Sequence, residues 1–169
     1  MDRGVNLRGM YIRVYSSARR VHRLKVFGAI SVTCVVLAFA ALCLGAYIEQ
    51  GINGLVRLLL VSAVPFLLIS FIRLVLNYER PYELVNLKQF ERMRKLRKAG
   101  KSFPSRHVFS AFLIGAILLE YCVPLAALTL FFGAYIAVER VLLGIHFPRD
   151  VVFGAIFGVA FGLIGTLFL

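Results

Sequence analysis

The chain alternates between long apolar runs and shorter polar segments, most of which are basic. Two runs, at residues 27–48 and 55–76, each reach the roughly 20 residues that a helix needs to cross the hydrocarbon core of a membrane. Three further runs cover residues 105–119, 125–143 and 150–169. Only helices and closed barrels satisfy their backbone polar groups in lipid. The pattern therefore predicts an all-α integral membrane protein, a bundle of about five transmembrane helices.

Turn-forming residues separate these runs. The segment Glu49–Gly54 contains two glycines and an asparagine and predicts a turn between the first two helices. Glu120–Pro124 predicts a second tight turn. Because a proline disfavours the helical conformation at the residue before it, Pro81 predicts that the second helix ends at Arg80.

The two longest polar segments are basic and contain regularly placed apolar residues. Residues 1–26 predict either a basic helix lying on the membrane surface or a disordered tail. Tyr82–Lys101 has apolar residues at three- and four-residue spacing, which favours a basic interfacial helix over a solvated charge run. We therefore divide the chain into a basic N-terminal interfacial segment, residues 1–26, and a transmembrane domain, residues 27–169.

The distribution of charge predicts an orientation. The formal net charge is +12 at pH 7. Five spans place the N-terminus, the 77–104 connection and the 144–149 turn on one side, together with every Lys and Arg except Arg57. The positive-inside rule assigns that side to the cytoplasm. Because the basic residues flank apolar runs, the expected partners are the bilayer and a phosphorylated lipid rather than nucleic acid.

Three other features bear on processing and assembly. The apolar run after the basic N-terminus is too long for the core of a cleavable signal peptide, so we expect a retained first helix. The three cysteines lie in apolar stretches without a pairing pattern or metal-ligand spacing. The last run carries Gly154, Gly158 and Gly162, a small-residue stripe that permits close helix packing. Its partner is either another span or a second copy of the chain in a homo-oligomer.

Three polar clusters fall on the basic side, at the ends of spans. Arg73 and Arg80 are seven residues apart, so a continuous helix would place both guanidinium groups on one face, where they could grip a phosphate. Ser105 is a good N-cap for the third span. His107 follows in the first turn, where it could give a proton to a leaving oxygen.

The third cluster closes the fourth span and opens the fifth. Gly144 predicts the turn after Arg140, and Pro148 suits the first position of the next helix. Asp150 is then close enough to orient the ring of His146 and leave one imidazole nitrogen free to attack. Taken alone, such a pair could equally be structural.

The three clusters together resemble the signature of the type 2 phosphatidic acid phosphatase family, which shares a site like that of the vanadium haloperoxidases. The family pattern reads Lys-x6-Arg-Pro, Pro-Ser-Gly-His and Ser-Arg-x5-His-x3-Asp. The matching positions in this chain are Arg73, Arg80 and Pro81, then Pro104, Ser105, Arg106 and His107, then Arg140, His146 and Asp150.

The resemblance implies a role for each residue. His146 would be the nucleophile that forms a phosphohistidine, with Asp150 orienting it. His107 would protonate the leaving lipid oxygen and then activate water. The phosphoryl oxygens would be held by Arg73, Arg80, Ser105, Arg106 through its backbone amide, and Arg140. The resemblance implies no metal and no cofactor.

The chain departs from the family pattern at three positions. Arg73 replaces the usual Lys, and the planar, forked guanidinium group of arginine is not equivalent to the compact ammonium group of lysine. Arg106 replaces Gly and could contact a second phosphate or point into solvent. Glu139 replaces Ser beside Arg140; a carboxylate near an anionic substrate is unfavourable, so we expect it to pair with an arginine or face away.

We therefore expect a lipid phosphatase of the bacterial plasma membrane. Its substrate would be phosphatidate, phosphatidylglycerophosphate, or an isoprenyl mono- or diphosphate such as that of undecaprenol. Two alternatives use the same residues: a lipid phosphotransferase and an inactive lipid-binding homologue. A channel would place polar residues at mid-span, whereas these clusters lie at span ends.

Overall fold

The computed structural model describes residues 3–96 and 99–169. Residues 1–2 of the expected N-terminal segment, and positions 97 and 98 of the expected interfacial helix, lie outside the described residues. The described part is mostly helical and contains no strands. Its helices are α1 (Arg3–Tyr15), α2 (Ala18–Leu76), α3 (Pro81–Leu84), α4 (Lys88–Leu96), α5 (Arg106–Tyr121), α6 (Val123–Leu142) and α7 (Pro148–Thr166).

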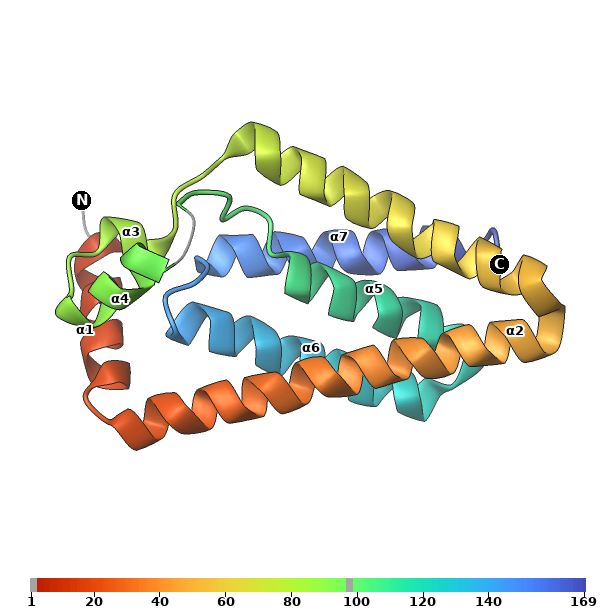
Figure 1. The fold of residues 1–169 in the computed structure, drawn as a ribbon, viewed down its shortest axis with the longest axis horizontal. Coiled ribbons are helices and arrows are strands. Elements are labelled where there is room, and N and C mark those ends of the chain that lie inside the picture. Colours follow the sequence, from red (N-terminus) through yellow and green to blue (C-terminus); the bar gives the residue numbers. More distant parts are fainter. Residues whose placement is uncertain (1–2, 97–98) are drawn as a thin grey trace.

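Helix α2 forms a long hairpin, because it bends sharply at Gly51 (Figure 1). The backbone there has φ 65° and ψ −152°, a conformation that only glycine adopts without strain. This confirms the turn expected within Glu49–Gly54. The first arm begins at Ala18, so residues 18–26 of the expected N-terminal segment form the first turns of α2.

The helices fit an integral membrane protein. Three helical stretches in the described part are long and apolar enough to cross a membrane: Ala18–Leu84, which includes both arms of α2, Val123–Leu142 and Pro148–Thr166. The 16 residues of α5 rise only about 24 Å, less than the roughly 30 Å of a hydrocarbon core. The all-α membrane fold expected from the sequence is therefore confirmed.

Helix α5 lies at the centre of the bundle, between α2, α6 and α7 (Figure 1). Between Val108 and Leu118 none of its side chains is exposed, and those of Val108, Phe109, Ile117 and Leu118 are fully or almost fully buried. A helix that is apolar all round is typical of such an enclosed position. Because α5 is held on several sides, its N-terminal turn is a rigid support for polar residues.

The glycine stripe of α7 packs against α5 in the same chain. A Cβ atom at Gly158 would lie 2.5 Å from the carbonyl oxygen of Phe109, and one at Gly154 would lie 2.8 Å from that of Ser105. Gly162 approaches α5 in the same way at Leu113. The stripe is buried against α5, so its packing partner within this chain is another span, and the homo-oligomer considered from the sequence stays a prediction.

A smaller hydrophobic cluster covers the basic end, where α1, α3 and α4 meet. Its buried members are Tyr11, Tyr82, Leu87 and Phe90. The Phe90 ring packs edge to face on Tyr11, with 5.3 Å between centroids. Phe90 also approaches Gly144 so closely that a Cβ there would lie 2.7 Å from the ring. The cluster therefore fixes the turn between α6 and α7.

The same cluster corrects the expected interfacial helix. The segment Tyr82–Lys101 is not one helix, because the chain leaves the helical conformation between Leu84 and Lys88. Arg94 donates hydrogen bonds across this break to the carbonyls of Tyr82 and Val85, both at 3.3 Å. The bend allows side chains on both sides of the break to be buried together, which a straight surface helix could not do.

We expect Gly158→Ala to destabilise the protein by about 1–3 kcal/mol, because the added methyl group forces α5 and α7 apart. Gly45→Ala is the matched control, since a Cβ at Gly45 meets nothing within 4 Å. Alanine has the higher helix propensity, so the control should be neutral or stabilising. Thermal unfolding in detergent measures both variants, and equal melting temperatures would contradict this packing.

Candidate active site

Arg73 points from the last turn of α2 toward the loop before α5. Its side chain is buried, and one guanidinium nitrogen donates a 2.8 Å hydrogen bond to the carbonyl of Pro104. A carbonyl accepts a hydrogen bond but carries no formal charge. The cation is therefore held in place while its charge remains available to an anion.

The expectation that Arg73 and Arg80 share a helical face is wrong. Helix α2 ends at Leu76, and Asn77 adopts the left-handed conformation with φ 42°. Its N–H donates to the carbonyl of Arg73 at 3.2 Å. Asparagine tolerates this conformation better than most residues, which explains why the helix ends before Pro81.

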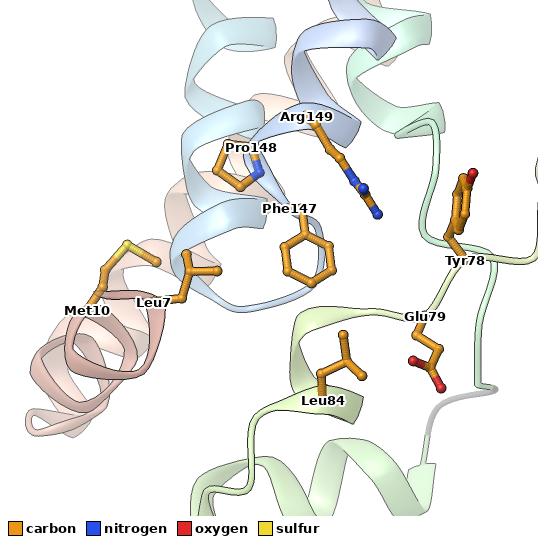
Figure 2. A pocket seen from close by; sticks show the side chains of 8 residues that line it. All are labelled: Leu7, Met10, Tyr78, Glu79, Leu84, Phe147, Pro148 and Arg149. Carbon is orange, nitrogen blue, oxygen red and sulfur yellow. The ribbon is translucent and has the colours of Figure 1, made fainter. Parts of the chain in front are cut away.

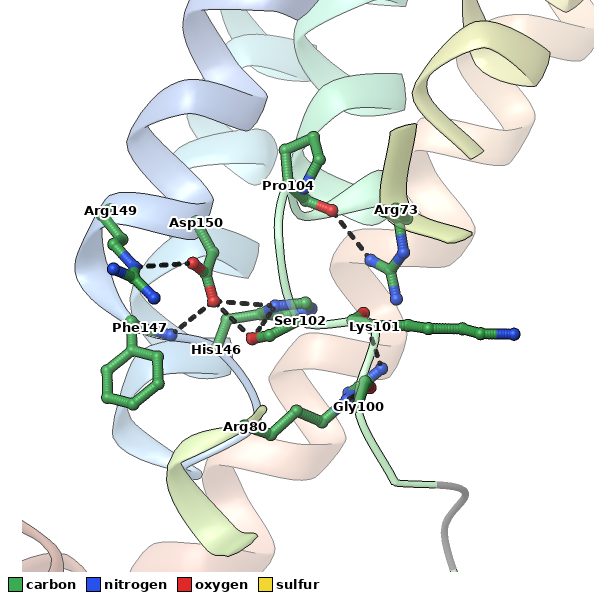
Figure 3. A network of polar contacts seen from close by, with 10 residues as sticks. All are labelled: Arg73, Arg80, Gly100, Lys101, Ser102, Pro104, His146, Phe147, Arg149 and Asp150. Atoms are coloured by element: carbon green, nitrogen blue, oxygen red, sulfur yellow. Dashed lines mark hydrogen bonds and ion pairs between the residues drawn. The ribbon is translucent and has the colours of Figure 1, made fainter. Parts of the chain in front are cut away.

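Arg80 reaches the site from an extended segment instead. Its Nε donates to the carbonyl of Gly100 at 3.0 Å, and a second nitrogen donates to that of Lys101 at 3.4 Å. Both acceptors belong to the loop before α5, as Figure 3 shows. The two arginines are therefore brought together by one loop and not by one helix.

The same loop carries a site residue that the sequence did not reveal. Ser102 is completely buried, and its N–H donates to the carbonyl of Tyr78 at 2.8 Å. Its hydroxyl donates a short hydrogen bond to Asp150, which lies 48 residues further along the chain. A serine in a polar connection is unremarkable locally, so no sequence signal pointed to it.

Helix α5 begins as expected, with Ser105 at the N-cap position. The backbone N–H of Ser105 donates to the carbonyl of Asp150 at 2.9 Å, which joins the starts of α5 and α7. Its side chain makes no cap hydrogen bond. The buried hydroxyl oxygen has no hydrogen-bond partner in the described part of the chain, so it is available to a ligand.

The next two residues, Arg106 and His107, are exposed and face a cavity of about 380 Å³. The guanidinium of Arg106 lies over the ring of Phe66, with 5.7 Å to the centroid. Several charged and titratable groups interact electrostatically with His107: Arg140, His146, Arg106 and Arg73. Residues from all three sequence clusters therefore lie near enough to His107 to influence its charge.

The turn between α6 and α7 positions His146. Gly144 has φ 68°, and the N–H groups of Ile145 and His146 both donate to the carbonyl of Arg140, at 2.9 and 3.2 Å. Pro148 occupies the first position of α7. The turn and the helix start therefore agree with the sequence prediction.

Asp150 is the centre of a buried polar network (Figure 3). Its Oδ2 accepts hydrogen bonds from Ser102 and from the N–H of Phe147, the latter at 3.0 Å. The Nδ1 atom of His146 lies 3.6 Å from the same oxygen, which is too long for a hydrogen bond. The hydroxyl of Ser102 is 3.5 Å from Nδ1, so it contacts both partners.

The surroundings of His146 favour its neutral form. The side chain is buried, and burial lowers the pKa of the imidazole because a charged ring is poorly solvated there. The positive charges of Arg80 and Arg73 lower the pKa further, while Asp150 opposes the shift. A neutral imidazole has a lone pair for nucleophilic attack.

Glu139 is buried against α2. Its carboxylate is 3.2 Å from the Nε of Arg140, which confirms the expected pairing with an arginine. A Cβ at Gly28 would lie 2.9 Å from the carboxyl carbon, so the glycine makes room for it. Within residues 3–96 and 99–169, no three His, Cys, Asp or Glu side chains gather closely enough to hold a metal ion.

Comparisons with solved structures agree with this fold. The chain matches two solved structures: LpxE from Aquifex aeolicus, and the first transmembrane PAP2-type phosphatidylglycerolphosphate phosphatase from Bacillus subtilis. The first match has 21% identity and a TM-score of 0.64, and covers 93% of this chain and 92% of the other. The second has 18% identity and a TM-score of 0.68, and covers 97% and 84%.

The sequence comparisons name the family. A search of curated protein sequences found no match. The model of the PAP2 superfamily matches residues 54–169, a segment that contains all three polar clusters and both histidines of the site. The chain therefore belongs to the PAP2 superfamily.

Proposed function

We propose that this protein is a membrane lipid phosphatase that works through a phosphohistidine. It removes phosphate from a lipid phosphomonoester or diphosphate. The observation that carries the proposal is the buried imidazole of His146, which lies between the carboxylate of Asp150 on one side and the charges of Arg73 and Arg80 on the other (Figure 3). Phosphoryl transfer needs this combination of a positioned nucleophile and surrounding positive charge.

His146 acts as the nucleophile. Its Nδ1 faces Ser102 and Asp150, which leaves Nε2 for the phosphorus atom. A bond forms between Nε2 and phosphorus while the bond from phosphorus to the lipid oxygen breaks. Asp150 stabilises the positive charge that develops on the ring.

His107 supplies the proton. It stands at the rim of the cavity, where it protonates the lipid oxygen as that oxygen leaves. In the second step it removes a proton from water, which attacks the phosphohistidine and releases inorganic phosphate. No step in this sequence requires a metal ion or a cofactor.

The phosphoryl oxygens are held by cations and by the start of α5. Arg73 and Arg80 make their described hydrogen bonds to carbonyls, so their charges are not neutralised by those bonds. The hydroxyl of Ser105 and the backbone N–H of Arg106 add uncharged donors at a helix N-terminus. Arg140 contributes less charge than the others, because Glu139 lies beside it.

The cavity beside His107 supports a lipid as the substrate. It lies between the two arms of α2 and α5, and apart from Arg106, His107 and Ser110 its lining is apolar, including Val35, Phe39 and Ile136. A second cavity, of about 290 Å³, shares Phe39 and Phe66 with it. An acyl or prenyl chain fits such a lining, whereas a soluble phosphate ester would leave it unfilled.

The exposed Arg106 favours a substrate with a second phosphate. It stands beside His107 at the mouth of the same cavity and has no carboxylate partner among the described ion pairs. An isoprenyl diphosphate would use it, and phosphatidate and phosphatidylglycerophosphate are the other candidates. The charge bias favours the cytoplasmic face of a bacterial plasma membrane as the side of the reaction.

We expect the purified protein to release phosphate from a panel of phosphatidate, phosphatidylglycerophosphate and isoprenyl mono- and diphosphates, and to do so in EDTA. His146→Ala should reduce the rate to background, because no other group takes its place. His22→Ala, at an exposed position near the start of α2, is the control. Phosphate release by the His146 variant at the wild-type rate would exclude the proposal, and activity lost in EDTA would exclude the metal-free mechanism.

We expect Ser102→Ala to lower kcat by about 10- to 100-fold, a cost typical of losing a hydrogen bond that orients a reactive histidine system. KM should change little, because Ser102 is buried behind Asp150 and does not reach the cavity. Steady-state kinetics on the best substrate of the panel separate the two constants. A loss confined to KM would show that Ser102 serves substrate binding instead.

We expect Ala63→Phe to slow hydrolysis of long-chain substrates more than that of short-chain analogues, because the new ring fills the second cavity. Val64→Phe, on the neighbouring exposed position, is the matched control. The measurement is the ratio of kcat/KM for long-chain and dihexanoyl substrates. If Ala63→Phe leaves that ratio unchanged, the cavity does not hold the lipid chain.

A further inference from the structure

A separate cavity of about 690 Å³ lies at the basic end, beside Phe147 and Arg149 (Figure 2). It is bounded by α1, the segment after α2, α3 and the start of α7. No residue of its lining belongs to the cavity that holds Arg106 and His107. The catalytic mechanism makes no use of it.

Arg149 forms the positive wall of this cavity. Its guanidinium lies over the ring of Tyr78 at 5.2 Å and over that of Phe147 at 5.4 Å, so two aromatic side chains hold it. Its Nε is 3.5 Å from the Oδ1 of Asp150. The side chain is nevertheless 58% exposed, so most of its hydrogen-bond donors remain free for a ligand.

Glu79 lines the same cavity and is exposed. Among the ion pairs of the described residues, none joins Glu79 to Arg149 or to any other cation. The cavity therefore presents one cation and one carboxylate that do not neutralise each other. A purely anionic ligand would be attracted by Arg149 and repelled by Glu79.

The remaining lining is apolar. Leu7 and Met10 of α1 face Phe147 across the cavity, and Leu84 of α3 closes it from below in the view of Figure 2. Leu84 is 58% exposed, so its side chain is accessible to a ligand. A ligand that matches this lining combines two opposite charges with an apolar surface.

We propose that this cavity binds the headgroup of a zwitterionic phospholipid with an amine, such as phosphatidylethanolamine. The phosphate contacts Arg149, the ammonium contacts Glu79, and the glycerol and upper acyl chain cover Leu7, Met10 and Leu84. The site lies at the basic end of the bundle, which is at the level of the lipid headgroups. A phosphate on Arg149 also competes with Asp150 for the guanidinium.

That competition links the site to catalysis. When Arg149 turns toward the lipid phosphate, its positive charge moves away from Asp150, the carboxylate that orients His146. This consequence rests on the proposed function, whereas lipid binding itself does not. A binding measurement therefore tests the site even if the catalytic proposal fails.

The test is native mass spectrometry of the purified full-length protein with dihexanoyl phosphatidylethanolamine, dihexanoyl phosphatidylglycerol and free O-phosphoethanolamine. Leu84→Trp fills the cavity, so any lipid that this variant still binds is bound elsewhere. Leu96→Trp, which also replaces an exposed leucine, is its control. Arg149→Gln and Glu79→Gln remove the charges. Arg92→Gln, at an exposed position on α4, is the control for Arg149→Gln.

We expect phosphatidylethanolamine to bind wild type, Leu96→Trp and Arg92→Gln alike. Arg149→Gln and Glu79→Gln should each weaken binding roughly tenfold, the size of one charged hydrogen bond, and Leu84→Trp should leave only background. Equal binding to wild type and Arg149→Gln would overturn the site. Phosphatidylglycerol binding as tightly would overturn the zwitterionic ligand, and equally tight binding of O-phosphoethanolamine would overturn the lipid.

Discussion

The burial of one carboxylate organises the basic end of this protein. Asp150 is fully buried, and a buried carboxylate is costly unless hydrogen bonds and charges compensate it. The compensation comes from the loop before α5, through Ser102, and from the N-cap residue of α7, through the N–H of Phe147. The backbone carbonyl of Asp150 accepts a hydrogen bond from the N–H of Ser105. The hydrogen bonds of Asp150 therefore join the two helix starts that form the candidate site.

This junction depends on how closely α5 and α7 approach. Glycine at positions 154, 158 and 162 brings the two backbones into contact, with no side chain between them. A wider separation would move Ser105 and His107 away from His146. The hairpin of α2 leaves room on the other side of α5, where the apolar cavities lie. Tight packing on one face and open space on the other thus produce a reactive centre with a path for a lipid chain.

The features that the sequence predicted are those with a local cause. Gly51 bends α2, Gly144 makes the turn after α6, and Pro148 starts α7, each because of its own backbone preferences. The pairing of Glu139 with Arg140 is likewise a contact between neighbours in the chain.

The features that the sequence missed depend on distant partners. Arg73 and Arg80 were assigned to one helical face, but Asn77 ends the helix between them and the loop near Gly100 brings them together. The interfacial helix breaks because the residues on both sides of the break bury against α1. Ser102 acquires its role only through its hydrogen bond to Asp150, and no sequence pattern near Ser102 predicts that contact.

The central claim is that Ser102 and Asp150 hold His146 as a nucleophile, and the most direct measurement is the identity of the phosphorylated residue. A substrate with a labelled phosphoryl group is mixed with excess enzyme, quenched rapidly in alkali, and the labelled peptide is mapped by mass spectrometry. We expect the label on His146, formed and lost at rates compatible with turnover. Label on another residue, or phosphate release without labelled protein during a single turnover, would contradict the account.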